Sequence, residues 1–319
     1  MIRDLEKKVL SGTPLQRDEA LSLAAASGQA IFDLFSAANR IRDRFRGGRI
    51  DLCAIVNAKS GACPEDCAYC AQSAKSSAPI DAYSLMGEED VLKKAAEAKQ
   101  GGARRFCIVT SGRKASARDL VRIAGMISRV RSMGLLPCST LGLLDRDELL
   151  LLKDAGLERY HHNLETSEAF FPRICSTHSY KDKLATIKAV QSLGLSLCSG
   201  GIFGLGETWE DRIDMASALR DIGPDSVPIN FLTPIAGTGL GTRGPLDPLE
   251  ALKIVSIYRF MLPEKEIRIC GGRIQTLGEM NAFVFLAGAD GLLTGNYLTT
   301  TGRRFEDDLS LISRCGLRT

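Results

Sequence analysis

Three cysteines in one short segment are the residues of this chain best suited to chemistry. Cys63, Cys67 and Cys70 stand in "GACPEDCAYCAQ" with the spacing C-x3-C-x2-C. Three thiolates from one loop can hold three corners of a cubane iron–sulfur cluster and leave the fourth iron without a protein ligand. A structural zinc site would need a fourth ligand at short range, and the next cysteine is Cys107. The spacing therefore predicts a cluster whose open iron binds a substrate or cofactor.

A second set of cysteines is spread along the chain. Cys107, Cys138, Cys198 and Cys270 each fall inside a different predicted strand. Side chains alternate across a strand, so about half of such positions face the interior of a barrel. Four unrelated core thiols would be unremarkable, because free cysteine packs well as a small hydrophobe. Four on separate strands of one barrel favour a shared metal site, since the interior is where distant strands converge.

The residues around this second set leave its fourth ligand open. Arg268 lies two positions before Cys270, so both side chains should face the same way. A buried arginine needs an anionic partner, and it could screen an anionic cluster. Ligation of iron by a deprotonated guanidine would be unusual. Cys53 on the first strand is a fifth candidate, whereas Cys175 and Cys315 lie outside the strand pattern and are interpreted as inert thiols.

Two further motifs lie at the C-terminal ends of predicted strands. "GGIFGLGET" at 200–208 carries glycines that let the backbone approach a ligand closely. In "HHNLETS", Asn163 and Glu165 are two apart and can face one ligand together, although strand-end capping would also explain them. His161 and His162 are adjacent, so they should face opposite ways and not share a metal.

Apolar strands alternate with amphipathic helices along the chain, which is typical of parallel βα units. The predicted strands are 51–57, 104–110, 135–141, 157–164, 195–203, 225–232, 266–271 and 290–295. The predicted helices are 88–101, 117–133, 145–155, 180–193, 210–222, 247–261 and 275–287.

This alternation predicts an α/β fold, a (β/α)8 TIM-type barrel. We expect an N-terminal helical extension over 1–46, the barrel over 47–305, and a short C-terminal helix and tail over 306–319. A doubly wound open sheet is the alternative. In such barrels chemistry takes place at the C-terminal ends of the strands, and the triple-cysteine loop follows the first strand.

Composition places the chain among ordinary globular enzymes. Hydrophobic residues make up 45% and charged residues 25%, and the net charge is +3, so nothing favours nucleic acid or a membrane as partner. The N-terminal segment lacks the apolar core of a signal peptide, and no apolar run approaches the ~18 residues of a membrane span. Ten cysteines without a secretory signal indicate a reducing compartment, so we expect a cytoplasmic protein.

Together these motifs resemble those of one family. The cysteine spacing with Tyr69 before the last cysteine resembles the radical S-adenosylmethionine (SAM) superfamily. The motifs "GACPEDCAYCAQSA", "RRFC", "CSTLG", "HHNLETS", "CSGGIFGLGET", "SVPINFL" and "IRICGGR" are similar to those of the biotin synthase family within it. The resemblance runs from about residue 30 to the C-terminus.

The resemblance implies an activity and its cofactors. SAM would chelate the open iron of a [4Fe–4S] cluster and be cleaved to a 5′-deoxyadenosyl radical. That radical would abstract hydrogen from dethiobiotin. Sulfur from an auxiliary cluster, commonly [2Fe–2S], would close the thiophane ring of biotin. The family is usually homodimeric, and an electron donor such as a flavodoxin or ferredoxin would supply the reducing equivalent.

The resemblance also implies roles for individual residues, with no catalytic side chain beyond the cofactors. The [4Fe–4S] ligands are Cys63, Cys67 and Cys70; the auxiliary ligands are Cys107, Cys138, Cys198 and Arg268 or Cys270; the SAM contacts are Tyr69, Asn163, Glu165, Gly200, Gly201 and Ile202; the dethiobiotin contacts are Asn163 and Asn230.

The chain departs from the family pattern at three places. The second strand continues "IVTSGR", His161 replaces a usual asparagine, and Cys270 replaces a usual serine. A thiolate binds iron far better than a neutral guanidine. Cys270 therefore predicts that the auxiliary cluster has four cysteine ligands and is of the larger [4Fe–4S] type, with Arg268 as a counter-charge.

Two other functions are weighed against this one. Another radical SAM barrel enzyme, similar to a hydrogenase maturase or a methylornithine synthase, is the alternative, and the inward cysteine set argues against a simple isomerase. An electron carrier or iron–sulfur scaffold would need neither strand-end motif and would not favour an open iron.

Overall fold

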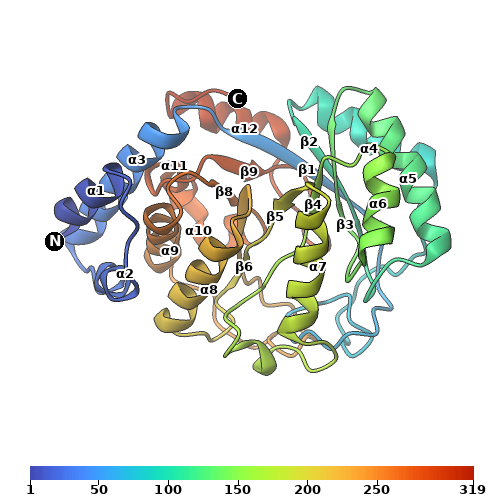
Figure 1. Ribbon diagram of the computed structural model, residues 1–319, viewed down its shortest axis with the longest axis horizontal. Helices are drawn as coiled ribbons and strands as arrows, with labels where there is room; N and C mark the ends of the chain where they lie inside the picture. Colours follow the sequence, from blue (N-terminus) through green and yellow to red (C-terminus); the bar gives the residue numbers. More distant parts are fainter.

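The structure is a computed structural model that describes residues 1–319. Its centre is a parallel sheet in which the strands run in the order β5-β4-β3-β2-β1-β9-β8-β7-β6. Additional pairing between β5 and β7 closes the sheet into a barrel, as Figure 1 shows. The strands are β1 (Asp51–Lys59), β2 (Arg105–Thr110), β3 (Leu136–Thr140), β4 (Arg159–His161), β5 (Ser196–Cys198), β6 (Gly201–Phe203), β7 (Ser226–Phe231), β8 (Glu266–Ile269) and β9 (Gly291–Leu293).

The predicted barrel is thus confirmed, with one difference in the fifth strand. Residues 195–203 were expected to form one strand, but the structure divides them into β5 and β6. The chain bends at Ser199 and Gly200, where the Ser199 amide donates to the Ser226 carbonyl oxygen at 3.0 Å. A Cβ on Gly200 would lie 2.0 Å from the Pro228 carbonyl oxygen, so this close approach of two backbones requires glycine.

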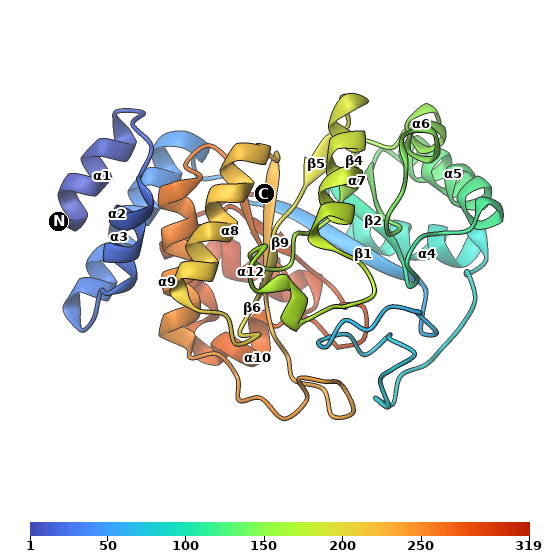
Figure 2. The same ribbon diagram turned by 60° about the horizontal axis from the view of Figure 1, so that its bottom comes forward.

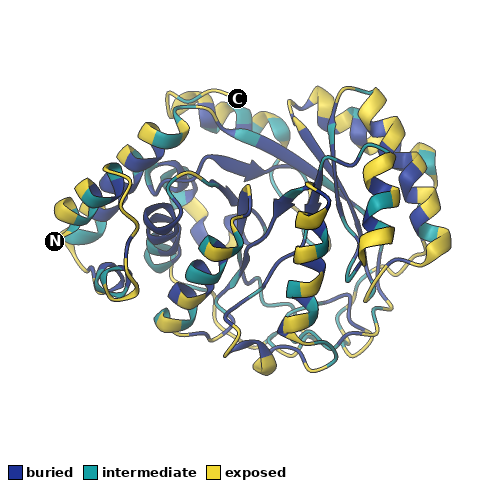
Figure 3. Cartoon of the chain, viewed as in Figure 1, coloured by how far each residue is buried: buried dark blue, intermediate teal, exposed yellow.

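Helices surround the barrel in Figure 1. The crossover helices are α4 (Glu88–Gln100), α5 (Ala117–Ser132), α6 (Arg146–Asp154), α7 (Tyr180–Ser192), α8 (Trp209–Ile222) and α9 (Pro248–Met261). Side-chain caps start several of them, for example Asp145 at α6 and Ser179 at α7, each within a capping box. Figure 3 shows the expected division, with buried residues on the faces that meet the sheet and exposed residues on the outside.

The predicted helix over 275–287 is broken into three short pieces. It consists of α10 (Arg273–Leu277), the 3-10 turn η2 (Gly278–Ala282) and α11 (Phe283–Leu286). Gly278 interrupts the α-helix because it takes a positive φ of 47°, a backbone conformation outside the right-handed helical region. A second 3-10 turn, η1 (Phe171–Arg173), follows β4.

The chain ends add helices to the barrel. The first three helices are α1 (Ile2–Leu10), α2 (Arg17–Ala24) and α3 (Gln29–Arg46), and the last is α12 (Phe305–Arg314). Helix α3 packs against α9 and α1, and α2 packs against α8 and α9, so these helices cover one side of the barrel in Figure 2. No helix is both long and apolar enough to cross a membrane.

Candidate active site

The triple-cysteine loop begins directly after β1. Gly61 turns the chain with φ of 75°, and a Cβ there would lie 2.6 Å from the Cβ of Ala82. The Cys63 amide donates to the Gln72 carbonyl oxygen at 3.1 Å, and the Cys70 amide donates to the Cys67 carbonyl oxygen at 2.9 Å. These bonds make the loop compact, and all three thiols are free and partly exposed.

Two distant segments hold this loop against the barrel. The Ala68 amide donates to the Ile174 carbonyl oxygen at 2.8 Å, and the Leu240 amide donates to the Ala68 carbonyl oxygen at 3.0 Å. Figure 2 shows the loop and the segment after β7 at the same end of the barrel, where the strands finish. The loop therefore lies where TIM-type barrels carry their chemistry.

The barrel encloses a cavity of about 280 Å³ whose lining includes five cysteines. They come from or directly follow different strands, and they are Cys53, Cys107, Cys138, Cys198 and Cys270. Parallel register explains part of this convergence, because Cys107 lies directly opposite Cys138 on the neighbouring strand. Cys270 was expected within a strand but lies one residue beyond β8, where its amide donates to the Ile229 carbonyl oxygen at 2.9 Å.

These barrel thiols are held in their protonated form by burial. Desolvation raises the pKa of every one of them, that of Cys198 to about 11 and that of Cys270 to about 12. A bound metal would reverse this preference, since ligation requires and stabilises the thiolate. The set is thus a group of neutral soft donors that releases protons when metal binds.

Arg268 is tied to carboxylates inside the barrel. Its guanidinium donates to the carboxylates of Glu266 and Asp51 and, at 2.8 Å, to the Leu292 carbonyl oxygen. Burial alone would lower the pKa of Arg268, but the two carboxylates outweigh it and raise that pKa well above the ordinary value. A protonated guanidinium has no lone pair with which to bind iron.

Two further arginines beside this cavity were missed by the sequence reasoning. Arg105 and Arg159 line the cavity, and strand register places Arg105 opposite Cys53 and Arg159 opposite Cys138. Both guanidinium groups favour the thiolate form of Cys138. The alternation of strand side chains could have indicated Arg105, which lies two residues before Cys107 in "RRFC".

The two strand-end motifs pair with each other through their backbones. The Ile202 amide donates to the Glu165 carbonyl oxygen at 2.9 Å, and Glu165 has a positive φ of 74°. For a residue other than glycine such a conformation is strained and is frequent at functional sites. The structure thus brings together Glu165, Gly200, Gly201 and Ile202, four of the six predicted SAM contacts.

The other residues predicted to contact SAM or dethiobiotin are Tyr69, Asn163 and Asn230. Tyr69 and Asn230 line the cavity, whereas Asn163 does not. The Asn163 amide nitrogen donates to Glu165 at 3.2 Å, and its oxygen accepts from the Gly200 amide at 3.1 Å. Asn230 likewise donates to the Gly201 carbonyl oxygen at 3.1 Å and accepts from the Gly271 amide at 3.0 Å. Both side chains therefore also hold neighbouring strand ends together.

The two adjacent histidines face opposite ways. His161 lines the cavity, with Nδ1 at 2.7 Å from the Thr140 hydroxyl and Nε2 at 2.8 Å from the Asn163 oxygen. His162 is buried and stacks on Tyr160. Desolvation lowers the pKa of both imidazoles.

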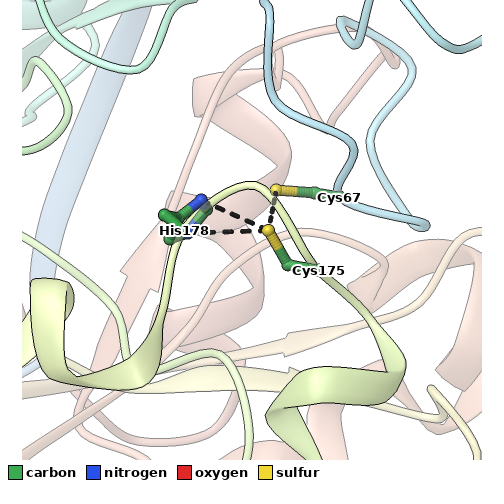
Figure 4. A group of neighbouring side chains, drawn as sticks. All are labelled: Cys67, Cys175 and His178. Atoms are coloured by element: carbon green, nitrogen blue, oxygen red, sulfur yellow. Dashed lines mark hydrogen bonds between the residues drawn. The ribbon is translucent and has the colours of Figure 1, made fainter.

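Cys175, interpreted from the sequence as an inert thiol, lies against the triple-cysteine loop. Its Sγ lies 3.8 Å from Sγ of Cys67, a residue of the loop, and 3.2 Å from Nδ1 of His178. Figure 4 shows the three side chains pointing toward one another. The bond with Cys67 lowers the pKa of the Cys175 thiol to about 6 and raises that of Cys67. Position 175 lies outside the strand pattern, so no periodicity could reveal this contact; Cys315 is exposed.

Comparison with known proteins identifies the family. Residues 58–219 match the radical SAM superfamily, and residues 228–318 match the biotin and thiamin synthesis associated domain. The chain is 52% identical over 287 residues to a biotin synthase of Thermodesulfovibrio yellowstonii, which covers 90% of each chain. It is 48% identical over 312 residues to one of Pelobacter propionicus, covering 97% of this chain and 95% of that relative.

The chain belongs to the biotin synthase family. It is therefore a radical SAM sulfurtransferase of biotin biosynthesis, and its cofactors are a [4Fe–4S] cluster, SAM and an auxiliary iron–sulfur cluster. The donor sets suit these groups: three thiols of one loop suit an open cluster, and buried thiols of several strands suit a second cluster inside the barrel.

Solved structures support the fold alone. Methylornithine synthase superposes with a TM-score of 0.87 at 20% identity, covering 98% of this chain and 96% of that one. The FeFe-hydrogenase maturase of Carboxydothermus hydrogenoformans superposes with a TM-score of 0.83 at 17% identity, covering 99% and 78%. The sequence relatives are biotin synthases and favour neither of these two activities.

Proposed function

We propose that this biotin synthase family member converts dethiobiotin to biotin and that the barrel cysteines hold the cluster that supplies the sulfur. The observation that carries the proposal is the cavity in which five cysteines and Arg268 converge within the same barrel as the triple-cysteine loop. A radical SAM enzyme that only rearranges its substrate needs no such second set of soft ligands.

Cys63, Cys67 and Cys70 would hold the [4Fe–4S] cluster. When bound, this cluster and SAM supply a radical able to abstract hydrogen from unactivated carbon. The protein's part is to orient SAM, and the paired backbones of Glu165 and Gly201 would form one wall of that site. Glycine at this wall is required by space, because a Cβ on Gly201 would lie 2.5 Å from the Glu165 carbonyl oxygen. Tyr69, Asn163, Gly200 and Ile202 complete the proposed SAM contacts.

Cys107, Cys138, Cys198 and Cys270 would hold the auxiliary cluster, whose sulfide is the second substrate. Four thiolates favour a [4Fe–4S]-type cluster over a [2Fe–2S] cluster with an arginine ligand. The two terminal nitrogens of Arg268 are bound by Glu266, Asp51 and Leu292, so the guanidinium would compensate the anionic cluster rather than bind its iron. Arg105 and Arg159 add positive charge next to Cys138.

Asn230 would position dethiobiotin in the same cavity, together with Asn163 at its wall. An amide side chain matches a urea group, which offers both N–H donors and a carbonyl acceptor. Apolar residues such as Val109, Leu293 and Leu298 also line the cavity and suit the aliphatic part of the substrate. Residues 297–300, which follow β9, also line the cavity.

The decisive experiment is anaerobic reconstitution with iron and sulfide, followed by addition of SAM, dithionite and dethiobiotin. Biotin should appear in the mass spectrum, with one SAM cleaved for each hydrogen abstracted. Sulfur labelled in the auxiliary cluster should be found in the product. SAM cleavage that ignores dethiobiotin, with no biotin formed, would refute the proposal and favour another radical SAM reaction.

Three further properties are proposed from the family resemblance. The physiological electron donor is a flavodoxin or ferredoxin, the enzyme is a homodimer, and it acts in the cytoplasm. Reduction assays with purified donors and analytical ultracentrifugation test the first two.

A further inference from the structure

Thr140 and His161 lie next to each other inside the barrel, at the ends of neighbouring strands. Thr140 is the last residue of β3 and His161 is the last residue of β4. Register pairs Cys138 with Arg159 two residues earlier on these strands, so Thr140 and His161 face the same way as that pair. All four residues line the cavity that the barrel cysteines share. Neither Thr140 nor His161 is among the proposed ligands of a cluster or contacts of SAM and dethiobiotin.

The side-chain amide of Asn163 fixes which nitrogen of the His161 ring carries a proton. The Asn163 oxygen accepts from the Gly200 amide at 3.1 Å, and the Asn163 nitrogen donates to Glu165 at 3.2 Å. These two partners settle the orientation of the Asn163 amide. Nε2 of His161 lies 2.8 Å from the Asn163 oxygen. Because an amide oxygen can only accept, Nε2 is the nitrogen that carries the proton.

The other ring nitrogen of His161 is then an acceptor. The ring contacts a hydroxyl and an amide and forms no ion pair, whereas the imidazole of His178 is paired with a carboxylate. An enclosed imidazole without an anionic partner is neutral, so Nδ1 keeps its lone pair. Nδ1 lies 2.7 Å from the Thr140 hydroxyl oxygen. The Thr140 hydroxyl therefore donates its single proton to Nδ1.

This direction leaves the sulfur of Cys107 without a hydroxyl donor. Sγ of Cys107 lies 3.7 Å from the same Thr140 oxygen. While the hydroxyl proton points to His161, this oxygen can only accept, and a Cys107 thiolate bound to iron has no proton to give. A donor to that thiolate would withdraw electron density and stabilise the reduced form of the cluster. The absence of such a donor keeps the reduction potential of the cluster low.

We propose that His161 is a positioning residue for the auxiliary cluster: by accepting the Thr140 proton, it keeps the hydroxyl from donating to the Cys107 thiolate and holds the reduction potential of that cluster low. The inference rests on the proposed function, in which Cys107 is a cluster ligand. His161 binds no iron and acts through Thr140. Its tautomer is set by Asn163, a proposed contact of SAM and dethiobiotin, so one hydrogen-bonded chain joins that contact to a ligand of the cluster.

A redox titration of the reconstituted enzyme, followed by electron paramagnetic resonance, tests this role. His161→Leu removes the acceptor and frees the hydroxyl for Cys107, so the potential of the auxiliary cluster should shift upward. His161→Gln, whose amide offers one donor and one acceptor, should stay near the wild type. His162→Leu removes the neighbouring imidazole, which faces the other way, and is the matched control. The loop cluster, identified by the response of its signal to SAM, is the internal reference and should not shift.

The double variant His161→Leu/Thr140→Val separates this role from a structural one. Valine has nearly the shape of threonine but no hydroxyl, so the potential should return to the wild-type value. Thr140→Val alone should hardly change it. A shift that persists in the double variant would overturn the proposal, because the shape of the side chain and not the hydroxyl would then set the potential. An unchanged potential in His161→Leu, or a lowered one in Thr140→Val, would overturn it as well.

The tautomer of His161 can be measured separately in the iron-free protein. The chain has three histidines, and long-range ¹H–¹⁵N spectra distinguish a protonated ring nitrogen from an unprotonated one. The His161 signals, assigned by their loss in His161→Gln, should show the proton on Nε2. A proton on Nδ1 would contradict the proposal. Reconstituted protein that holds the loop cluster alone would instead refute the proposed function, so the two failures are distinguishable.

Discussion

The guanidinium of Arg268 donates a hydrogen bond to the carboxylate of Glu266, two residues earlier on β8. Both side chains are buried, and the same guanidinium also donates to the carboxylate of Asp51 on β1. Removing one member of a buried pair leaves an uncompensated charge, which typically costs about 3–5 kcal/mol. Substitutions of Arg268 therefore test cluster ligation only when Glu266, the more deeply buried of its two carboxylate partners, is changed as well.

The fourth ligand of the auxiliary cluster can be assigned on this basis. Cys270→Ser should reduce the iron content of the auxiliary cluster and change its Mössbauer spectrum while sparing the loop cluster. Arg268→Gln combined with Glu266→Gln should leave the iron content near that of the wild type. Cys315→Ser serves as the thiol control, because Cys315 is exposed and does not line the cavity. A silent Cys270→Ser with loss of iron in the paired variant would indicate arginine ligation.

Replacing Cys67 by alanine should abolish the cleavage of SAM. The substitution removes one of the three protein ligands of the loop cluster, and no other thiol of the loop can replace it. Production of 5′-deoxyadenosine under dithionite, measured by liquid chromatography, should fall to background. Cys315→Ser should match the wild type, and cleavage by Cys67→Ala at the wild-type rate would disprove the ligand assignment.

Asn230→Ala should weaken dethiobiotin binding more than SAM binding. The structure adds a cost in stability, because the side chain joins Gly201 to Gly271 and its loss leaves two partly buried backbone groups unpaired. We expect about 1–3 kcal/mol from that source. Isothermal titration with each ligand, on protein shown to be folded by circular dichroism, separates the two effects. Equal losses for both ligands would argue for a purely structural role.

Gly200→Ala should destabilise the barrel by at least about 1–3 kcal/mol. The added Cβ would lie 2.0 Å from the Pro228 carbonyl oxygen, where only a shift of β7 could relieve the clash. Gly244→Ala is the matched control, since no atom lies within 4 Å of the Cβ it would add. Thermal unfolding should separate the two variants clearly; the same midpoint in both would show that the strand break tolerates a side chain.

Acid should destabilise the protein through its buried histidines. Burial lowers the pKa of His161 and His162 below the ordinary 6.5, so the unfolded chain binds more protons. Their contribution to stability is present above pH 6.5 and is lost as the pH falls below it, by up to about 1.4 kcal/mol per pH unit for each imidazole.

His162→Leu should make stability less dependent on pH in this range. The imidazole Nε2 of His162 has no hydrogen-bond partner, so the substitution strands no polar group. Anaerobic urea denaturation at pH values on either side of 6.5 gives the free energy of unfolding of both proteins. Its slope against pH should be smaller for His162→Leu than for the wild type, whichever protein is the more stable. Parallel slopes would rule out His162 as a source of the acid sensitivity.

Much of this protein could be predicted from local sequence patterns. The spacing of Cys63, Cys67 and Cys70 specifies a cluster loop because all three ligands lie within a few residues of one another. The alternation of apolar strands and amphipathic helices predicts the barrel, because the spacing of apolar residues distinguishes a strand from a helix. Periodicity alone left the direction of each strand cysteine open, but the position of Cys107, Cys138 and Cys198 on separate strands favoured a shared interior site, and all three line the cavity.

Only the tertiary structure could decide which distant residues meet. Cys175 contacts Cys67 across 108 residues of sequence, and Arg268 contacts Asp51 across 217. Neither pair follows from a period or a motif. The first depends on how two loops pack against each other, and the second depends on which strands become neighbours in the barrel. The break between β5 and β6 has the same origin: it is imposed by the close approach of Gly200 to Pro228, a neighbour that the chain gains only when the barrel closes.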